Sequence, residues 1–319
     1  MARVIVTGGV GFIGYHLSRA LLARGDDVLA IDDLSDAPYP RAWKERNHRD
    51  LVREFGARAR LLVTCITDRD SMSEAFRGAE TVMHLAGLAG VRPSFREPAR
   101  YSRVNVEGTA TILELAKEAG ATKYLFASSS SVYGNSTPLP AVEDAPAVVP
   151  ESPYAATKRG AELVASAIAR VTPGLPVTAL RFFTVYGPRQ RPEMAITLFM
   201  RAVLAGRPIT LFGDGSMRRD FTHVDDIVRG ILASSELAPA GFRPYNLGSG
   251  APVTLRELVD AIGAVAGKTP QIERAEVPPG DVDATFADIS RARTELAWQP
   301  RVPLVAGLES VRDWVLQNP

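Results

Sequence analysis

The sequence has one cysteine, no tract of basic residues and no long apolar run. A single cysteine, Cys65, excludes an internal disulfide and any metal site built from several cysteines, and it fits a reducing compartment. The formal net charge is +1 with Lys and Arg dispersed, which gives no electrostatic footprint for nucleic acid or anionic lipid. No apolar run approaches the roughly 20 residues of a membrane span, and glycines follow residues 3–6 at once, unlike in a signal peptide. We therefore expect a cytoplasmic protein with no metal site, whose partners are small molecules or a second copy of itself.

Short apolar runs alternate with amphipathic stretches through the first half of the chain. Continuous apolar runs are typical of parallel strands, because both faces of such a sheet are covered. Ile13, Leu17 and Leu21 share one helical face, which predicts a helix over 12–24 that stops at Gly25. The expected strands are residues 4–6, 28–31, 81–85, 124–127 and 177–182. The sequence therefore predicts an α/β fold with a Rossmann-type, doubly wound parallel sheet.

A glycine-rich turn follows the first predicted strand. Glycines allow the tight turn and the close approach of a pyrophosphate, and the helix N-terminus offers unpaired N–H groups to its oxygens. Asp32 follows the second strand, where a carboxylate can accept both adenosine ribose hydroxyls and repels a 2′-phosphate, so NAD is favoured over NADP. The alternative is a plain glycine turn with Asp32 at a solvated strand end. The residues expected to hold the pyrophosphate are Gly8, Gly11, Phe12, Ile13 and Gly14.

The composition of the sequence changes after about Arg181. Pro- and Gly-rich segments are interleaved there with short helices, which predicts a smaller, loop-rich region. Thr254 and Glu257 have the spacing of a capping box, and Asp68 can cap a helix in the first half. We predict a NAD-binding Rossmann domain at 1–180, to which segments after about 220 return. Residues 181–319 are predicted to form mainly a C-terminal α/β substrate-binding domain.

Tyr154 and Lys158 form a Tyr-x-x-x-Lys unit, whose spacing places both side chains on one face of a helix. A phenol is a poor base at neutral pH, but an adjacent ammonium stabilises the phenolate and lowers its pKa. The pattern alone also arises by chance. Upstream, the hydroxyls of Ser128 to Ser131 follow an apolar strand at the edge where doubly wound folds bind ligands, although a plain polar turn is the alternative.

These motifs occur in order together with His84-Leu85-Ala86, Asn105 with Gly108-Thr109, Leu180-Arg181-Phe182-Phe183 and Arg219-Asp220-Phe221. The whole chain resembles the extended short-chain dehydrogenase/reductase family of nucleotide-sugar epimerases and dehydratases. The resemblance implies that Ser129 assists Tyr154, and that His84 lies beside the cofactor as a packing residue. Further cofactor contacts implied in this way are Leu85, Ala86, Asn105, Tyr154 and Lys158. Residues that fall where UDP is held are Phe212, Arg219 and Asp281.

The family's shared first step is the removal of the proton from the sugar carbon 4 hydroxyl while hydride passes to NAD. Family dehydratases carry an Asp-Glu pair, and decarboxylases a Glu, where this chain has Ser130 and Ser131. Serine does not act as such an acid or base at neutral pH. The resemblance therefore implies 4-epimerisation of a UDP-sugar through a 4-keto intermediate, with hydride returned to the opposite face.

The expected sugar is UDP-glucuronate, converted to UDP-galacturonate. Thr184 stands where many neutral-sugar epimerases have Asn, and residues 186–195 resemble the corresponding segment of UDP-glucuronate 4-epimerases. Arg191 and the hydroxyls of Ser129, Ser130, Ser131 and Thr184 can bind a carboxylate. The alternatives are a UDP-glucose 4-epimerase, a dehydratase or decarboxylase, and a non-catalytic NAD-binding sensor.

Three positions depart from the family pattern. Cys65 stands where an Asp often contacts adenine, and Gly87 replaces a frequent alanine. Pro278 replaces an arginine that many neutral-sugar epimerases have, so the diphosphate is expected to depend on Arg92 or Arg219, with a structural ion pair as the alternative for Arg219. The resemblance also implies a homodimer, formed by the helices near Ile112 and Glu162.

Overall fold

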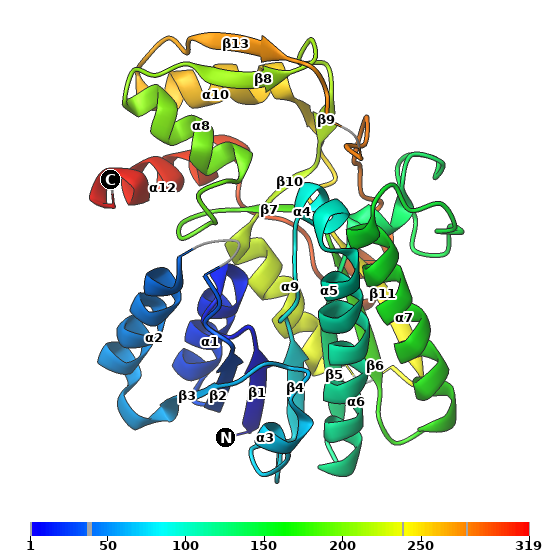
Figure 1. Cartoon of the computed structure of the whole chain (residues 1–319). Coiled ribbons are helices and arrows are strands. Elements are labelled where there is room, and N and C mark those ends of the chain that lie inside the picture. Colours follow the sequence, from blue (N-terminus) through cyan, green and yellow to red (C-terminus); the bar gives the residue numbers. More distant parts are fainter. Residues whose placement is uncertain (1, 37–39, 238, 279, 319) are drawn as a thin grey trace.

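Seven parallel strands form the central sheet of this computed structural model, which describes residues 2–36, 40–237, 239–278 and 280–318. Their order is β11-β6-β5-β4-β1-β2-β3 (Figure 1), so the chain reverses direction of travel between β1 and β4, where doubly wound folds bind ligands. The strands are β1 (Arg3–Thr7), β2 (Asp27–Asp32), β3 (Ala59–Val63), β4 (Thr81–His84), β5 (Lys123–Ser129), β6 (Val177–Phe182) and β11 (Phe242–Leu247). The predicted Rossmann-type fold is confirmed.

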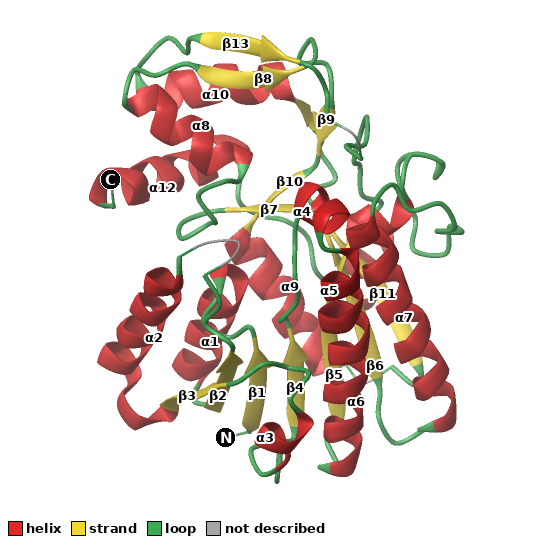
Figure 2. Ribbon diagram, viewed as in Figure 1, coloured by secondary structure: helices red, strands yellow, loops and turns green. Residues whose placement is uncertain are grey.

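Alternate side chains of each strand point to opposite faces of the sheet, so both faces are apolar. Helices cover both of these faces (Figure 2). Val4 and Val6 pack on one face, whereas Ile5 packs on the other. One face carries α1 (Phe12–Arg24), α2 (Arg41–Phe55) and α9 (Val224–Glu236). The other carries α3 (Arg69–Ser73), α6 (Gly108–Glu118) and α7 (Pro153–Val171), with α4 (Val91–Arg96) and α5 (Pro98–Ser102) above them. This sheet and its helices are called the cofactor lobe below.

The predicted elements agree with the structure wherever the apolar pattern is strong. The five expected strands and the helix over 12–24 are present, and Gly25 ends that helix with a φ of +102°, a conformation that suits glycine. β3 and β11 were not predicted. Both are edge strands of mixed polarity, and β11 contains Pro244, which an edge tolerates because no further strand needs its missing N–H.

A smaller region, called the upper lobe below, lies above the carboxyl ends of the strands (Figure 1). Its own apolar core includes Phe199, Leu211, Ile262 and Leu308. Its elements are α8 (Ala195–Leu204), β8 (Ile209–Phe212), α10 (Leu255–Ala266), β13 (Ile272–Ala275) and α12 (Leu304–Gln317). Short pairs join the lobes: β7 (Thr184–Tyr186) with β10 (Phe221–His223), and β9 (Arg218–Arg219) with β12 (Val253–Thr254).

The chain crosses between the lobes more than once, because β11 returns to the sheet after the first part of the upper lobe. α11 (Ser290–Glu295) then packs against β11 before α12 returns to the upper lobe. The boundary at residue 180 stays a prediction. Among the described residues, no helix is long and apolar enough to cross a membrane.

Candidate active site

The glycine turn between β1 and α1 has no room for side chains. Gly8 has a φ of +67°, and a Cβ on Gly14 would lie 1.9 Å from the carbonyl oxygen of Gly8. No side chain caps α1, whose first turn contains no acidic residue, so the N–H groups of Phe12 and Ile13 face outward from the helix start. This bare, electropositive helix N-terminus fits the pyrophosphate of a dinucleotide.

Asp32 lies at the carboxyl end of β2 and is buried. Its Oδ1 accepts hydrogen bonds from Lys44 Nζ at 3.0 Å and from the backbone N–H of Leu34 at 3.0 Å. Burial raises the pKa of Asp32, while the buried Lys44 ammonium opposes that shift. The carboxylate is therefore held in place by a lysine that the sequence reasoning missed, and the solvated strand end that stood as the alternative is not what the structure has.

Asn105 holds the loop that follows β4. It lies in a π-helical turn at Arg103–Glu107, accepts from Leu88 N at 2.8 Å and donates to Leu88 O at 3.0 Å. It also donates to Thr157 of α7 at 3.1 Å. These bonds fix the loop after β4. Leu85 and Ala86 begin this loop beside the glycine turn, where the N–H of Ala86 donates to the Thr7 hydroxyl. These contacts connect the expected cofactor edge with α7.

His84 is a neutral core residue. Burial, together with the nearby charge of Lys158, lowers its pKa to about 3. Its two ring nitrogens are engaged by the hydroxyls of Thr7 at 2.6 Å and Thr109 at 3.1 Å. The structure therefore gives it a packing and hydrogen-bonding position beneath the site.

Tyr154 and Lys158 lie on the first turns of α7, opposite Ser129 at the end of β5. Burial raises the pKa of Tyr154, whereas a hydrogen bond with Ser129 and the charge of Arg191 lower it. Lys158 donates to the carbonyl of Ala127 at 2.9 Å, and burial lowers its pKa to about 8. The effect of the Lys158 ammonium on the Tyr154 phenol stays a prediction.

Gly87 fits tightly beside this pair. A Cβ there would lie 3.2 Å from Lys158 Nζ and 3.0 Å from Asn105 Oδ1. The replacement of the frequent alanine by glycine therefore gives these two polar atoms room.

A buried ion pair beneath the serines was not predicted. Arg181 of β6 binds both carboxylate oxygens of Glu162 on α7, at 2.8 Å each, and both side chains are almost fully buried. Ser128 donates to the same Glu162 at 2.6 Å. The pair fixes β5, β6 and α7 to one another just below the reacting groups.

The hydroxyls expected at the sugar carboxylate gather at the same edge. Ser130 and Ser131 begin a 3₁₀ turn at Ser130–Tyr133, which Ser129 caps by accepting from Ser131 N at 3.2 Å. Thr184 begins β7 and is half-buried. Arg191 is partly buried, pairs with Glu193 at 3.1 Å and lies close enough to Tyr154 to influence its pKa.

The residues expected at UDP also converge, although they come from four separate segments. Arg92 of α4 stacks on the ring of Phe212 at 4.6 Å and pairs with Asp281 at 3.5 Å. Arg219 of β9 has its pKa lowered by burial and raised by Asp281 and Asp283. It donates to the carbonyl oxygens of Arg218 and Asp283 and forms no ion pair within 4 Å in the described structure.

A dinucleotide-binding sheet with a Tyr-Lys pair and a hydroxyl at its carboxyl edge defines a class of α/β enzymes that transfer hydride at a carbinol carbon. Among the described residues, no group of three or more His, Cys, Asp or Glu side chains could hold a metal ion. Residues 4–248 match the model of the NAD dependent epimerase/dehydratase family, and the chain belongs to that family.

Related proteins align with this chain over nearly its full length. It is 38% identical to "UDP-glucuronate 4-epimerase" of Thermodesulfobacterium geofontis over 100% of this chain and 97% of that one. It is 35% identical to "Probable UDP-glucuronate 4-epimerase" of Rhizobium meliloti, over 99% and 97%. The UDP-glucuronic acid 4-epimerase of Bacillus cereus, solved with UDP-glucuronic acid and NAD, is 34% identical and superposes with a TM-score of 0.92 over 99% of both chains. The predicted family is confirmed.

Proposed function

We propose that this protein is a NAD-dependent UDP-sugar 4-epimerase that interconverts UDP-glucuronate and UDP-galacturonate. The observation that carries the proposal is the position of Tyr154 and Lys158 on the first turns of α7, opposite Ser129 at the end of β5. No carboxylate acid or base stands at the two positions that follow Ser129. This arrangement moves one proton at one carbon and offers no group for elimination. The relatives named UDP-glucuronate 4-epimerase support the choice of sugar.

Three residues of the chain act at carbon 4 of the sugar. Tyr154 takes the hydroxyl proton, while Ser129 orients that hydroxyl and the tyrosine by hydrogen bonding. Lys158 supplies positive charge on the same helix face and is oriented by the Ala127 carbonyl. NAD, when bound, accepts the hydride from carbon 4 and returns it to the other face of the ketone. The bare start of α1, the Asp32 carboxylate and the loop held by Asn105 fit the pyrophosphate, ribose and nicotinamide ends of that cofactor.

The 4-keto uronate is a β-keto acid, which loses carbon dioxide when the breaking bond aligns with the ketone. We propose that Arg191 and the hydroxyls of Ser129, Ser130, Ser131 and Thr184 hold the carboxylate out of that alignment. Charge-assisted hydrogen bonds are the strongest contacts available for this purpose. The half-buried position of Thr184 next to β10 supports the proposal. At the other end, Arg92, Phe212, Arg219 and Asp281 would hold UDP.

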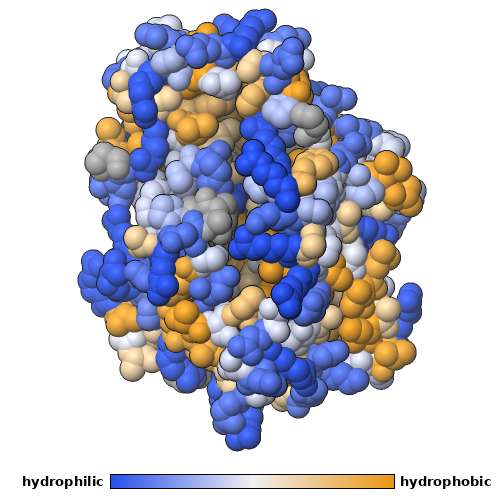
Figure 3. Space-filling view, in the orientation of Figure 1, coloured by the Kyte–Doolittle hydropathy of each residue, from blue (hydrophilic) through white to orange (hydrophobic). Residues whose placement is uncertain are grey.

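We also propose a homodimer in the cytoplasm. Ile112 and Glu162 are themselves fully buried within the chain, but α7 exposes Leu163 and Val171. Figure 3 shows apolar surface on the side of the molecule where α7 lies. An apolar helix face of this kind suits isologous pairing. The single cysteine supports a reducing compartment.

The test starts from either epimer. Purified protein without added NAD is incubated with UDP-glucuronate or UDP-galacturonate, and the products are followed by NMR. Convergence on one mixture from both sides is the expected result and indicates retained cofactor. Turnover of UDP-glucose alone would overturn the uronate assignment, a UDP-pentose as main product would indicate a decarboxylase, and no turnover even with added NAD would indicate a sensor.

A further inference from the structure

The turn before Arg191 is attached to the cofactor lobe by the side chain of Arg189 and by a hydrogen bond between the His16 ring of α1 and the carbonyl oxygen of Pro188 at 2.9 Å. Arg189 has a φ of +66°, a left-handed conformation that non-glycine residues rarely adopt and that must be held by its surroundings. The Arg189 guanidinium donates to Asn47 Oδ1 at 2.5 Å and to Asp50 Oδ2 at 2.6 Å, both on α2. It also stacks on the ring of Tyr15 of α1 at 4.0 Å. These contacts stabilise Arg189 in its strained backbone conformation.

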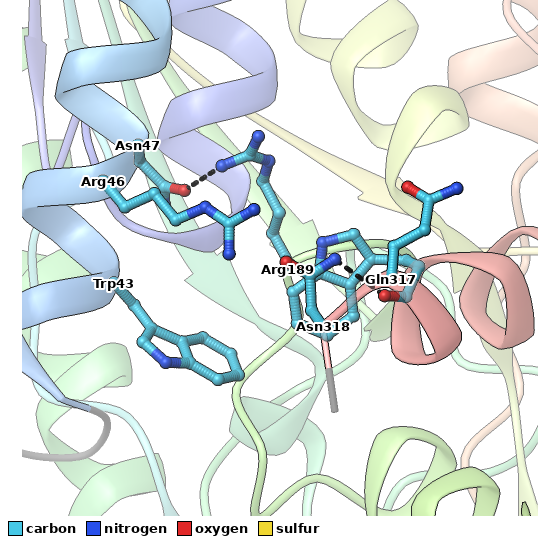
Figure 4. A pocket seen from close by; sticks show the side chains of 7 residues that line it. Trp43, Arg46, Asn47, Arg189, Gln317 and Asn318 are labelled. Atoms are coloured by element: carbon cyan, nitrogen blue, oxygen red, sulfur yellow. Dashed lines mark hydrogen bonds between the residues drawn. The ribbon is translucent and has the colours of Figure 1, made fainter.

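Figure 4 shows Arg189 directed at Asn47, at the wall of a cavity of about 310 Å³ between α2 and α12. The cavity is lined by Trp43, Arg46, Asn47, Arg189, Trp314, Gln317 and Asn318. The Arg189 guanidinium borders this open space and is held by its contacts with α1 and α2. These contacts, together with the His16 bond to Pro188, attach the turn to the cofactor lobe.

The same helix also holds the ribose end of the cofactor site. Lys44 and Asn47 are three residues apart and both are buried, so they share the inner face of α2. Lys44 binds Asp32, and Asn47 binds Arg189 and donates to the carbonyl of Val10 in the glycine turn at 2.9 Å. One helix face thus connects the carboxylate expected at the ribose with the turn that carries Arg191.

We infer that Arg189 is a positioning residue for Arg191, and that its attachment to Asn47 and Asp50 sets the preference for a uronate over a neutral sugar. This inference rests on the proposed function. Arg191 follows Arg189 by two residues, and Gln190 between them is fixed by bonds to Val185 O and Thr197. Because only one residue separates Arg191 from Arg189, release of the Arg189 anchor would change the direction in which the backbone presents Arg191. The proposed function gives Arg191 the sugar carboxylate, and the charge of Arg191 lowers the pKa of Tyr154.

The test compares ligand binding in a Tyr154→Phe background, which prevents turnover and keeps the bound cofactor. Calorimetry measures Kd for UDP-glucuronate and for UDP-glucose with and without Arg189→Ala. The expected result is a rise of roughly tenfold in Kd for UDP-glucuronate, the scale of one charge-assisted hydrogen bond, with Kd for UDP-glucose within twofold. A residue needed only for stability would change both affinities together.

Two further variants sharpen the result. Asp50→Asn removes one charge of the anchor without changing its shape and should give the same selective loss, but smaller. Arg53→Ala is the matched control, because Arg53 pairs with the other oxygen of Asp50 at 2.6 Å but is exposed, and it should leave both affinities unchanged. Equal changes for both sugars, or no change in Arg189→Ala, would overturn the inference. A Tyr154→Phe parent with no preference for UDP-glucuronate would instead contradict the proposed function, and the inference with it.

Discussion

The two ends of the expected substrate site are built in different ways. At the reaction end, Lys158 bonds to the backbone of β5 and Asn105 bonds to the backbone of the loop after β4. At the nucleotide end, Arg92 meets Phe212 and Asp281 through side chains alone, and more than half of its side chain is exposed. The reaction end is thus fixed by the same sheet that forms the core, whereas the nucleotide end depends on contacts between segments that are far apart in the chain.

This difference predicts two kinds of mutational response. Buried groups bonded to backbone are preorganised, so that their removal should change the rate of the chemical step. Groups at the nucleotide end, which act away from the reacting carbon, should change affinity, because they contribute equally to ground state and transition state. Four experiments, from the largest expected effect to the smallest, test this division.

Tyr154→Phe should reduce kcat by about a thousandfold or more while leaving the affinity for UDP-glucuronate within a few-fold, because only the proton-transfer group is lost. Turnover followed by NMR and binding by calorimetry measure the two quantities. Tyr101→Phe is the matched control. Its ring contacts that of Tyr154 at 6.4 Å, but its hydroxyl bonds only to Ala89 O among the described contacts. A Tyr154→Phe variant that keeps a tenth of the turnover would place the proton transfer elsewhere.

Lys158→Met should lower kcat at neutral pH by about a hundredfold. Burial disfavours the ammonium and lowers the Lys158 pKa to about 8, so the charge is present below that pH and lost above it. The kcat of the unsubstituted enzyme should therefore fall as pH rises through about 8, and the variant should lack that fall. A pH profile of kcat for both proteins decides the matter. The same basic limb in both would show that Lys158 does not titrate in the reaction.

Arg219→Ala should raise KM by roughly tenfold to a hundredfold, the scale of a charge-assisted hydrogen bond to phosphate, and leave kcat nearly unchanged. Initial rates over a range of UDP-glucuronate concentrations separate the two parameters. Arg218→Ala is the control, since Arg218 is the exposed neighbour on the same short strand. A loss of kcat in Arg219→Ala would contradict the prediction that the nucleotide end affects only affinity.

Thr184→Ala should have the smallest effect on rate and a visible effect on products. Loss of one hydroxyl loosens the carboxylate, so the proportion of UDP-pentose should rise a few-fold while epimerisation continues. NMR of the product mixture measures the ratio. An unchanged ratio with persisting turnover would mean that Thr184 does not restrain decarboxylation.

Much of the cofactor lobe could be predicted, because its signals are local. The helix over 12–24 ends at Gly25, Asp68 caps α3 by accepting from Ser71 N, and Thr254 forms a complete capping box with Glu257. Each of these depends on residues within a few positions of one another. The family followed for the same reason, since each of its motifs lies at the end of one strand or helix.

The contacts that were missed join residues far apart in the chain. Arg189 and Asn47 are 142 positions apart, and Lys44 lies on a helix whose sequence is strongly polar. Glu162 and Arg181 are both charged, and nothing in their local patterns indicates that the structure buries them against each other. Such pairs become visible only when the sheet brings their elements together. The roles assigned to individual site residues stay predictions.

The return of β11 to the sheet has a consequence for dissecting the protein. β6 is buried at all six positions, and β11 is the strand that covers its outer side. A fragment that stops before residue 242 would leave the N–H and C=O groups of β6 as an open, apolar edge, on which further chains can add. The fragment that carries the glycine turn should therefore aggregate when expressed alone. The cofactor-binding and sugar-binding parts are therefore expected to fold together, as one cooperative unit.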